Sequence, residues 1–227
     1  GARYCFDKSH GHKVPAHIFA GDEVLAKGFE TIKNKMNLDY IFAGEGHYDL
    51  EYRQYQVSYF RVDMNHVPIH RYVAPNEEMM IAISGYNDRN LINTALIYRY
   101  IISYEPRNFK GRLSEFPLTL TYGKKVDAFR KQYRNFLWDG EFQHTVGAKV
   151  LVDGEEWETY SVYTDKTTDK RAVVIANTNY DHNIKVDVQF DGKQSQLYSA
   201  NPENSAEVKF DEMGTIPPNS ALFVFEK

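Results

Sequence analysis

The chain has 227 residues, of which 42% are hydrophobic and 26% charged, and its formal net charge is −4. These fractions are those of an ordinary globular protein, and the sequence lacks the run of about 18 apolar residues that a membrane-spanning helix needs. The charges are spread without long blocks of one sign, so no basic surface for a nucleic-acid backbone is expected. We therefore expect neither a membrane nor nucleic acid as a partner, and the length favours two hydrophobic cores.

The cysteine content and the first residues limit the chemistry further. Cys5 is the single cysteine, which excludes an intramolecular disulfide and a Cys-x-x-Cys zinc motif. The chain starts without a basic and then apolar leader. An export signal is therefore expected to have been removed, or the chain to have been cut from a longer one.

Helices and short buried strands alternate over the first two thirds of the chain. Apolar residues at Leu25, Phe29, Ile32 and Met36 recur at the spacing of an amphipathic helix. The expected helices are 21–36, 89–104 and 117–137, and the expected strands are 38–43, 56–62 and 79–83. A helix followed by a buried strand is typical of a barrel or a doubly wound sheet.

The last third of the chain has only the period-two pattern of strands. The expected strands are 150–152, 157–163, 171–176, 184–190, 196–200, 206–210 and 221–225, with turns at 153–154, 179–181 and 191–192. This pattern predicts a small antiparallel β-sandwich.

The predicted fold class is therefore α/β plus all-β, in two domains. Residues 1–146 are expected to be the C-terminal portion of a (β/α)8-type barrel, and residues 147–227 a β-sandwich. A closed barrel usually needs about 250 residues, so the remaining barrel strands are expected in an upstream segment of the same protein. The alternative is a smaller, open α/β layer.

The end of the first predicted strand carries two carboxylates and an imidazole. Glu45 follows the strand directly, and His47 and Asp49 come next. Glycosidic cleavage needs one carboxyl group as proton donor and another as nucleophile or base, so Glu45 and Asp49 are the candidate catalytic residues. Alternatively, Glu45 is a structural carboxylate that binds backbone amides or an arginine such as Arg53.

Two further polar groups follow the next predicted strands. Arg61, Asp63, His70 and Arg71 come after the second strand, where such polar density suits the binding of sugar hydroxyls. Arg61 and Asp63 could instead pair with each other.

The third predicted strand is followed by Tyr86 and Asn87, which are also candidates for substrate binding. Asp88 comes directly before a predicted helix, and is expected to cap that helix rather than to catalyse.

His10 and His12 stand at a spacing of two residues, which two ligands of one metal could have. The spacing reveals no third ligand, so we expect these histidines to bind substrate or to organise the loop. The sequence also lacks a Gly-x-Ser-x-Gly elbow and a glycine-rich phosphate loop. No metal and no cofactor are expected.

Several of these motifs together resemble a known class of proteins. Residues 40–49, with Arg61 and the segments 70–72 and 84–88, are similar to glycosidase-like barrels of poorly characterised bacterial families, in the style of the α-amylase and α-galactosidase groups. Those proteins end in a small β-sandwich, as residues 148–227 are expected to do. In such families the nucleophile is commonly an aspartate at an earlier strand, which this sequence does not contain. The resemblance therefore assigns only the proton-donor role, to Glu45.

Two functions follow from these patterns. The first is a glycoside hydrolase, or a fragment of one, that acts on a carbohydrate through a carboxylate pair including Glu45. The alternative is a noncatalytic carbohydrate-binding or structural module, because fold alone does not decide function. The carbohydrate reading implies a periplasmic or secreted location.

Overall fold

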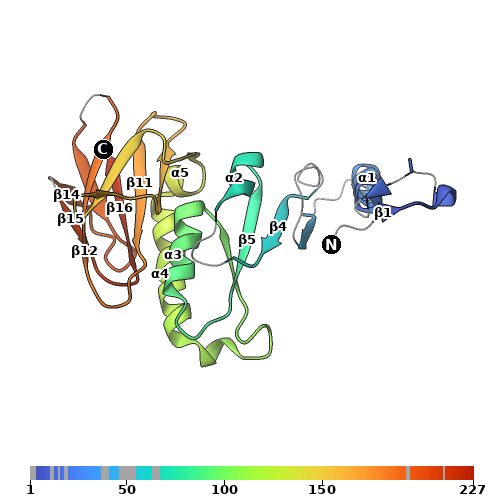
Figure 1. Ribbon diagram of the computed structural model, residues 1–227, viewed down its shortest axis with the longest axis horizontal. Coiled ribbons are helices and arrows are strands. Elements are labelled where there is room, and N and C mark those ends of the chain that lie inside the picture. The colour runs from blue at the N-terminus through green and yellow to red at the C-terminus, as the bar shows by residue number, and fades with distance from the viewer. Residues whose placement is uncertain are drawn as a thin grey trace.

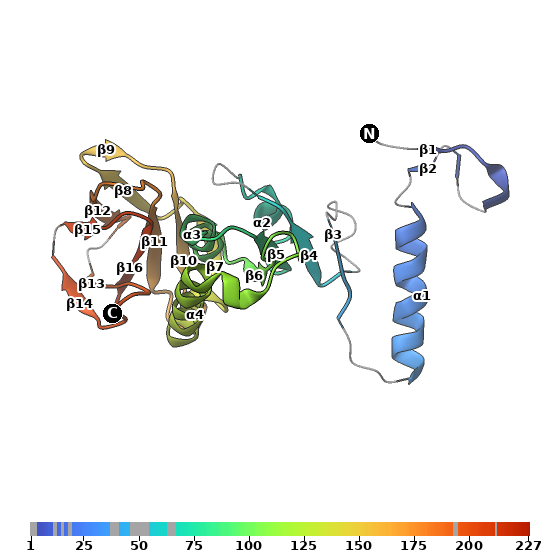
Figure 2. The same cartoon turned by 90° about the horizontal axis from the view of Figure 1, so that it is seen from below.

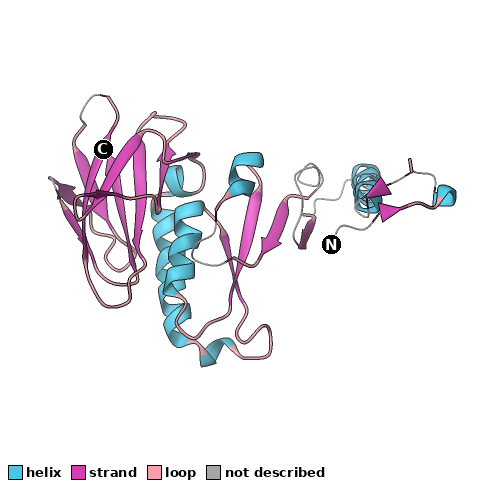
Figure 3. Cartoon of the chain, in the orientation of Figure 1, coloured by secondary structure: helices cyan, strands magenta, loops and turns pink. Residues whose placement is uncertain are grey.

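The computed structural model describes residues 4–10, 13–14, 16–17, 20–36, 41–45, 55–62, 67–192, 195–211 and 213–227. It has mixed α/β content, with one parallel sheet and three antiparallel ones (Figures 1 and 3). None of the described helices combines the length and the apolar character that a membrane crossing requires.

The N-terminal elements are a short strand pair and one long helix. Strands β1 (Tyr4–Cys5) and β2 (Ala16–His17) are antiparallel, with η1 (Lys8–His10) between them. Helix α1 (Ala20–Met36) follows, so the predicted helix is confirmed. Figure 2 shows α1 standing apart from the other helices, and its apolar residues Leu25, Ile32 and Met36 are exposed.

The parallel sheet is built in chain order. Strands β3 (Ala43–Glu45), β4 (Val57–Phe60), β5 (Glu78–Ile83) and β6 (Ile101–Tyr104) are neighbours in that order. Helix α2 (Ile69–Val73) connects β4 to β5, and α3 (Arg89–Tyr98) connects β5 to β6. The second and third predicted strands are confirmed. The first is displaced, because Gly44 and Glu45 lie inside β3 and residues 38–40 lie outside the described part of the chain.

The predicted helix over residues 89–104 is wrong in its second half. Helix α3 ends at Tyr98 because Arg99 takes the left-handed conformation (φ 56°), and the Tyr100 amide donates back to the Ala95 carbonyl oxygen at 2.8 Å. The next residues, Ile101 and Ile102, are β-branched and pair with β5 as strand β6. The described parallel sheet thus has four strands instead of the three expected.

The last helices lie between the parallel sheet and the C-terminal sheets (Figure 1). After η3 (Leu113–Glu115), the predicted helix 117–137 is present as α4 (Pro117–Gln132) and α5 (Arg134–Leu137), separated at Tyr133. One core joins Ile81 of β5 to Leu96 of α3, Phe129 of α4 and Phe223 of the C-terminal sheet.

Two antiparallel sheets form the C-terminal part. One has the strand order β14-β13-β16-β11-β10-β7 and the other β15-β12-β8-β9. Their strands are β7 (Glu141–His144), β8 (Ala148–Val152), β9 (Glu155–Glu156), β10 (Tyr160–Thr164), β11 (Arg171–Asn177), β12 (Ile184–Phe190), β13 (Leu197–Ala200), β14 (Val208–Phe210), β15 (Gly214–Ile216) and β16 (Ser220–Glu226). Each of the seven predicted strands is present, whereas β7, β9 and β15 were not expected.

A second core joins the two antiparallel sheets. Val150 and Val186 from the smaller sheet pack with Val162, Ile175 and Val224 from the larger one. Alternate residues of β11 face the helices instead, which explains why almost every residue of this strand is buried. The larger sheet is therefore covered on both faces.

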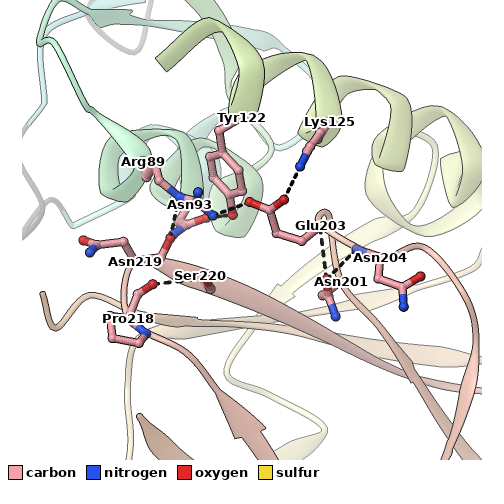
Figure 4. Close-up of polar contacts among 10 residues, drawn as sticks. All are labelled: Arg89, Asn93, Tyr122, Lys125, Asn201, Glu203, Asn204, Pro218, Asn219 and Ser220. Carbon is pink, nitrogen blue, oxygen red and sulfur yellow. Dashed lines mark hydrogen bonds and ion pairs between the residues drawn. The ribbon is translucent and has the colours of Figure 1, made fainter. Parts of the chain in front are cut away.

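An ionic cluster ties the helices to the loops of the larger sheet (Figure 4). Glu203 accepts from Arg89 of α3 at 2.5 Å and also from Lys125 of α4. The Arg89 guanidinium lies 3.9 Å from the centre of the Tyr122 ring, and its Nε donates to the Asn219 carbonyl oxygen at 3.1 Å. These contacts and the first core join residues on either side of the predicted boundary at residue 146, so the two predicted domains are in extensive contact. Their boundary stays a prediction.

Candidate functional site

The parallel strands all end at one edge of the sheet, which we call the carboxyl edge. Glu45 and Tyr59 are partners in register on β3 and β4, so their side chains point to the same face. By the same alternation, Arg61 follows on that face, and Ser103 and Glu105 lie on it along β6. The opposite face carries Ile81 and its neighbours and packs on the helices.

Glu105 is the centre of the polar groups at this edge. Its side chain is fully buried, directly after the last residue of β6. It accepts hydrogen bonds from the Tyr59 hydroxyl at 2.7 Å, from Ser103 Oγ at 2.9 Å and from Arg61 Nη2 at 3.4 Å. A buried carboxylate is costly unless it is paired and hydrogen-bonded, and these partners supply that compensation.

Arg61 connects the buried carboxylate to solvent. Its side chain is 54% exposed, although one end of the guanidinium contacts Glu105. The other end donates to Asn108 Oδ1 at 2.7 Å. The group is therefore held in a fixed orientation while part of it stays open to a ligand.

Tyr59 lies near the charged side chains of Glu105, Glu45 and Arg61 at this edge. Burial, the hydrogen bond to Glu105 and the nearby carboxylates of Glu105 and Glu45 raise the pKa of Tyr59 to about 12, and Arg61 opposes this rise. The hydroxyl therefore remains protonated at neutral pH and acts as a hydrogen-bond donor. The charge of Glu45 therefore changes the pKa of Tyr59 in the same direction as the charge of Glu105.

The structure brings Glu45 and Arg61, both expected from the sequence, to this one face. Four other candidates, Asp49, His12, His47 and Asp63, lie outside the described residues, as does the side chain of His10.

Arg71 lies at the opposite edge of the sheet, where the strands begin. It is fully buried and donates to the carbonyl oxygens of Pro75 and Glu77, which precede β5, and of Tyr98 and Arg99, which precede β6. These bonds use most of its donors on the backbone. The expected contact of Arg71 with substrate is replaced by a structural role.

His70 also lies away from Glu105. Its ring stacks on Phe60, with 4.0 Å between the ring centres, and burial lowers the pKa of His70. Phe60 is in register with Ile81, so it points to the helix-covered face of the sheet. His70 is therefore on the other face from Tyr59 and Arg61.

Tyr86 and Asn87 lie in the loop after β5, at the carboxyl edge, and Tyr86 is 61% exposed. The loop is fixed to α4, because Thr119 Oγ1 donates within 3.0 Å of the Gly85 and Tyr86 carbonyl oxygens. Both residues are exposed to solvent, as a binding role requires.

Asp88 occupies the N-cap position of α3, as expected, but its side chain does not bond the first turn. Its carboxylate accepts from the Gly85 amide instead. A Cβ atom at Gly85 would lie 2.5 Å from that carboxylate, so a larger residue here would displace the Asp88 side chain. Asp88 therefore closes the loop and is not available as a catalyst.

Sequence reasoning missed Tyr59, Ser103, Glu105 and Asn108. The signal for Glu105 was present, since the residue follows directly on a β-branched strand. It was hidden by the assignment of residues 101–104 to a helix. Within the described residues, no three histidine, cysteine, aspartate or glutamate side chains come together as a set that could hold a metal ion.

Comparison of the sequence with protein-family models finds no match, and comparison with curated proteins finds none either. Among solved structures, the chain is similar to a noncanonic maltogenic α-amylase, AmyB, from Thermotoga neapolitana, with a TM-score of 0.56 and 12% identity. The alignment covers 88% of this chain and 58% of the amylase.

Weaker likenesses are to a family 44 xyloglucanase from Paenibacillus polymyxa and an α-fucosidase from Thermotoga maritima. The xyloglucanase has a TM-score of 0.36 at 11% identity and covers 69% of this chain and 33% of its own. The fucosidase has a TM-score of 0.35 at 9% identity, with coverages of 76% and 43%. Only the likeness to the amylase carries an argument. It shows that the chain has a glycoside-hydrolase-like fold and spans somewhat more than half of that enzyme's length.

Proposed function

We propose that the chain is the C-terminal part of a glycoside hydrolase, which acts on a carbohydrate through a carboxylate pair that includes Glu45. The observation that carries this proposal is the position of Glu105 with its partners Tyr59, Ser103 and Arg61, which we call the Glu105 cluster. The cluster lies at the carboxyl edge, on the face of the sheet that the helices leave uncovered. In (β/α) barrels the working side chains lie at that edge. The fold likeness to the amylase supports the same architecture.

The architecture that we propose is a partial barrel followed by a β-sandwich, with the boundary between residues 146 and 147. The four parallel strands would be the last strands of the barrel, and an upstream segment of the same protein would supply the others. The half-exposed side chains of Tyr59 and Ser103 would then line the barrel interior. A periplasmic or secreted location belongs to this proposal, because carbohydrate is the expected substrate.

The distance between Glu45 and Glu105 indicates that these two glutamates have different roles. Glu45 ends β3 and Glu105 directly follows β6, and these strands are three strand spacings apart, or roughly 14 Å along the sheet. Catalytic carboxyl pairs of glycosidases are about 5–9.5 Å apart. Glu105 is therefore not the partner of Glu45 in the bond cleavage. It orients Tyr59 and Arg61, which would bind sugar hydroxyls.

Glu45 would donate a proton to the leaving oxygen of the glycosidic bond. It is exposed at the end of β3, the edge strand of the described sheet, and an upstream strand would cover it. The second carboxylate would be Asp49 or an aspartate of the upstream segment.

The second candidate function is a noncatalytic carbohydrate-binding module. The observation that favours it is the strand order, which puts Glu105, the buried carboxylate of this edge, roughly 14 Å from Glu45 along the sheet. The buried Glu105 with its tyrosine and arginine would then hold sugar without cleaving it.

The test is hydrolysis of aryl glycosides and oligosaccharides by the longest native chain that contains these residues. Activity that is lost in Glu45→Gln and kept in Glu155→Gln supports the proposal, since Glu155 is an exposed glutamate of the C-terminal sheets. Full activity in Glu45→Gln would refute the acid role. Saccharide binding without turnover in the parent chain would favour the module.

A further inference from the structure

The loop after β6 has an unusual backbone. Three consecutive residues, Arg107, Asn108 and Phe109, have positive φ angles of 48°, 51° and 66°. This left-handed region is unfavourable for residues other than glycine, and a run of three is costly. Such a conformation persists only where the surrounding structure holds it in place.

Hydrogen bonds hold the loop closed. The Asn108 amide donates to the Glu105 carbonyl oxygen at 2.9 Å, and the Gly111 amide donates to that of Pro106 at 2.9 Å. The Asn108 side chain accepts from Arg61 at 2.7 Å. The loop is therefore a rigid continuation of the Glu105 cluster, because Arg61 contacts both of them.

The loop presents a large apolar side chain to solvent. Phe109 is 69% exposed, at the carboxyl edge and directly beside the Arg61–Asn108 contact in the chain. A single exposed aromatic residue on a protein surface needs no explanation. Here, however, the exposed ring belongs to a strained, hydrogen-bonded loop next to a proposed site. That combination is typical of a binding element.

Three cationic residues flank Phe109 in the sequence. Arg107, Lys110 and Arg112 are all exposed and lie within three residues of it. Between residues 106 and 116 the sequence has one carboxylate, that of Glu115. The compact loop thus combines an aromatic face with a local excess of positive charge, whereas the whole chain has a net charge of −4.

We propose that Phe109 is the platform of a saccharide subsite that prefers a ring bearing a carboxylate, such as a uronic acid. The Phe109 face would stack on the C–H face of the sugar ring, and the flanking cations would pair with the carboxylate. The inference rests on the proposed function, since it places this subsite beside the site for bond cleavage.

Calorimetric titration of the full chain tests the subsite, with tetragalacturonate and maltotetraose as probes of equal length. We expect tighter binding of tetragalacturonate, and a loss of this preference in 0.5 M salt, where the Debye length of about 4 Å screens exposed charges. Phe109→Ala should weaken tetragalacturonate binding about tenfold, and Phe109→Trp should preserve it. Tyr180→Ala, at an equally exposed aromatic residue in the C-terminal sheets, is the matched control and should bind as the parent does.

Unchanged affinity in Phe109→Ala would overturn the platform, and equal affinities for the two probes would overturn the preference for a carboxylate. Absence of tetragalacturonate binding at millimolar concentration would overturn both. Because the readout is binding, these outcomes are separate from the hydrolysis test of Glu45.

Discussion

The two edges of the parallel sheet use the same residue type in opposite ways. At the edge where the strands begin, Arg71 is fully buried and its bonds go to backbone carbonyl oxygens. At the carboxyl edge, Arg61 is 54% exposed and is held by Glu105 and Asn108. The first arrangement stabilises the chain, and the second leaves oriented donors for a ligand. In barrels this division between a stabilising edge and a working edge is general.

Two more arginines belong to the stabilising edge. Arg99 donates to the carbonyl oxygens of Trp138 and Gly140, and Arg130 donates to those of Ala95 and Tyr100. Burial lowers the pKa of Arg130 to about 10, which still leaves it charged at neutral pH. These cations lie at the C-terminal end of α3, where the helix dipole favours positive charge.

The largest effect is expected from Arg71→Met. Removal of the buried guanidinium leaves the carbonyl oxygens before β5 and β6 without their donor, and should reduce the free energy of unfolding by about 1–3 kcal/mol for each carbonyl group that stays unsatisfied. Urea denaturation measures this change. Arg61→Met is the matched variant at the other edge and should cost less, because Glu105 keeps its hydrogen bonds from Tyr59 and Ser103. Equal losses in the two variants would remove the distinction between the edges.

A smaller effect is expected at high pH from Tyr163, which lies beside the buried arginines. Its hydroxyl donates to the Ile97 carbonyl oxygen, and burial raises the pKa of Tyr163 from 10.0 to about 12. Between those two pH values the folded chain keeps a proton that the unfolded chain has lost, so stability falls as the pH rises. The loss should be roughly 2–3 kcal/mol.

Unfolding in urea at pH 9 and pH 11 measures about half of that loss, or roughly 1.3 kcal/mol, and Tyr163→Phe should reduce the difference by this smaller amount. Tyr59→Phe, at the half-exposed edge, should reduce it less. If Tyr163→Phe loses as much stability over this range as the parent chain, the raised pKa is not the cause.

The smallest change in stability is expected from Glu105→Gln. In this variant an amide oxygen can still accept a hydrogen bond from Tyr59 or Ser103, so the fold should be kept. The pKa of Tyr59 should fall below about 12, because the Glu105 charge and hydrogen bond help to raise it, while the contribution of burial remains. Ultraviolet titration of tyrosine ionisation, with Tyr59→Phe as the reference that removes this group, measures the shift. An unchanged curve would indicate that Glu105 has no electrostatic effect on Tyr59.

Local patterns predicted most of the elements correctly. Helix α1 and strands β11 and β12 were expected from their helical or strand pattern, and β5 was expected as a short apolar run that breaks at Ser84 and Gly85. Strand β6 was not expected, because its apolar residues continue the apolar pattern of the preceding helix and show no separate strand periodicity. Its start depends on the left-handed turn at Arg99, which favours no particular sequence pattern.

The candidate site was predicted only in part, for a similar reason. Glu45 and Arg61 were found because they follow strands that the sequence reveals. The bond between Tyr59 and Glu105 joins residues 46 positions apart, and it exists only once β6 lies beside β5. Arg71 was assigned to the wrong edge because the short helix α2 carries the chain across the sheet within a few residues.

The aromatic contacts of Phe223 have a consequence for how this part of the chain could be inherited. Its ring centre lies 5.7 Å from that of Phe129, 4.8 Å from that of Tyr133 and 5.8 Å from that of Phe136. A gene fusion that moved only the antiparallel sheets to another enzyme would expose this aromatic surface to water. The sheets and helices α3, α4 and α5 are therefore expected to recombine as one module, because α3 packs on the same face of the larger sheet, with any workable crossover point upstream of Arg89.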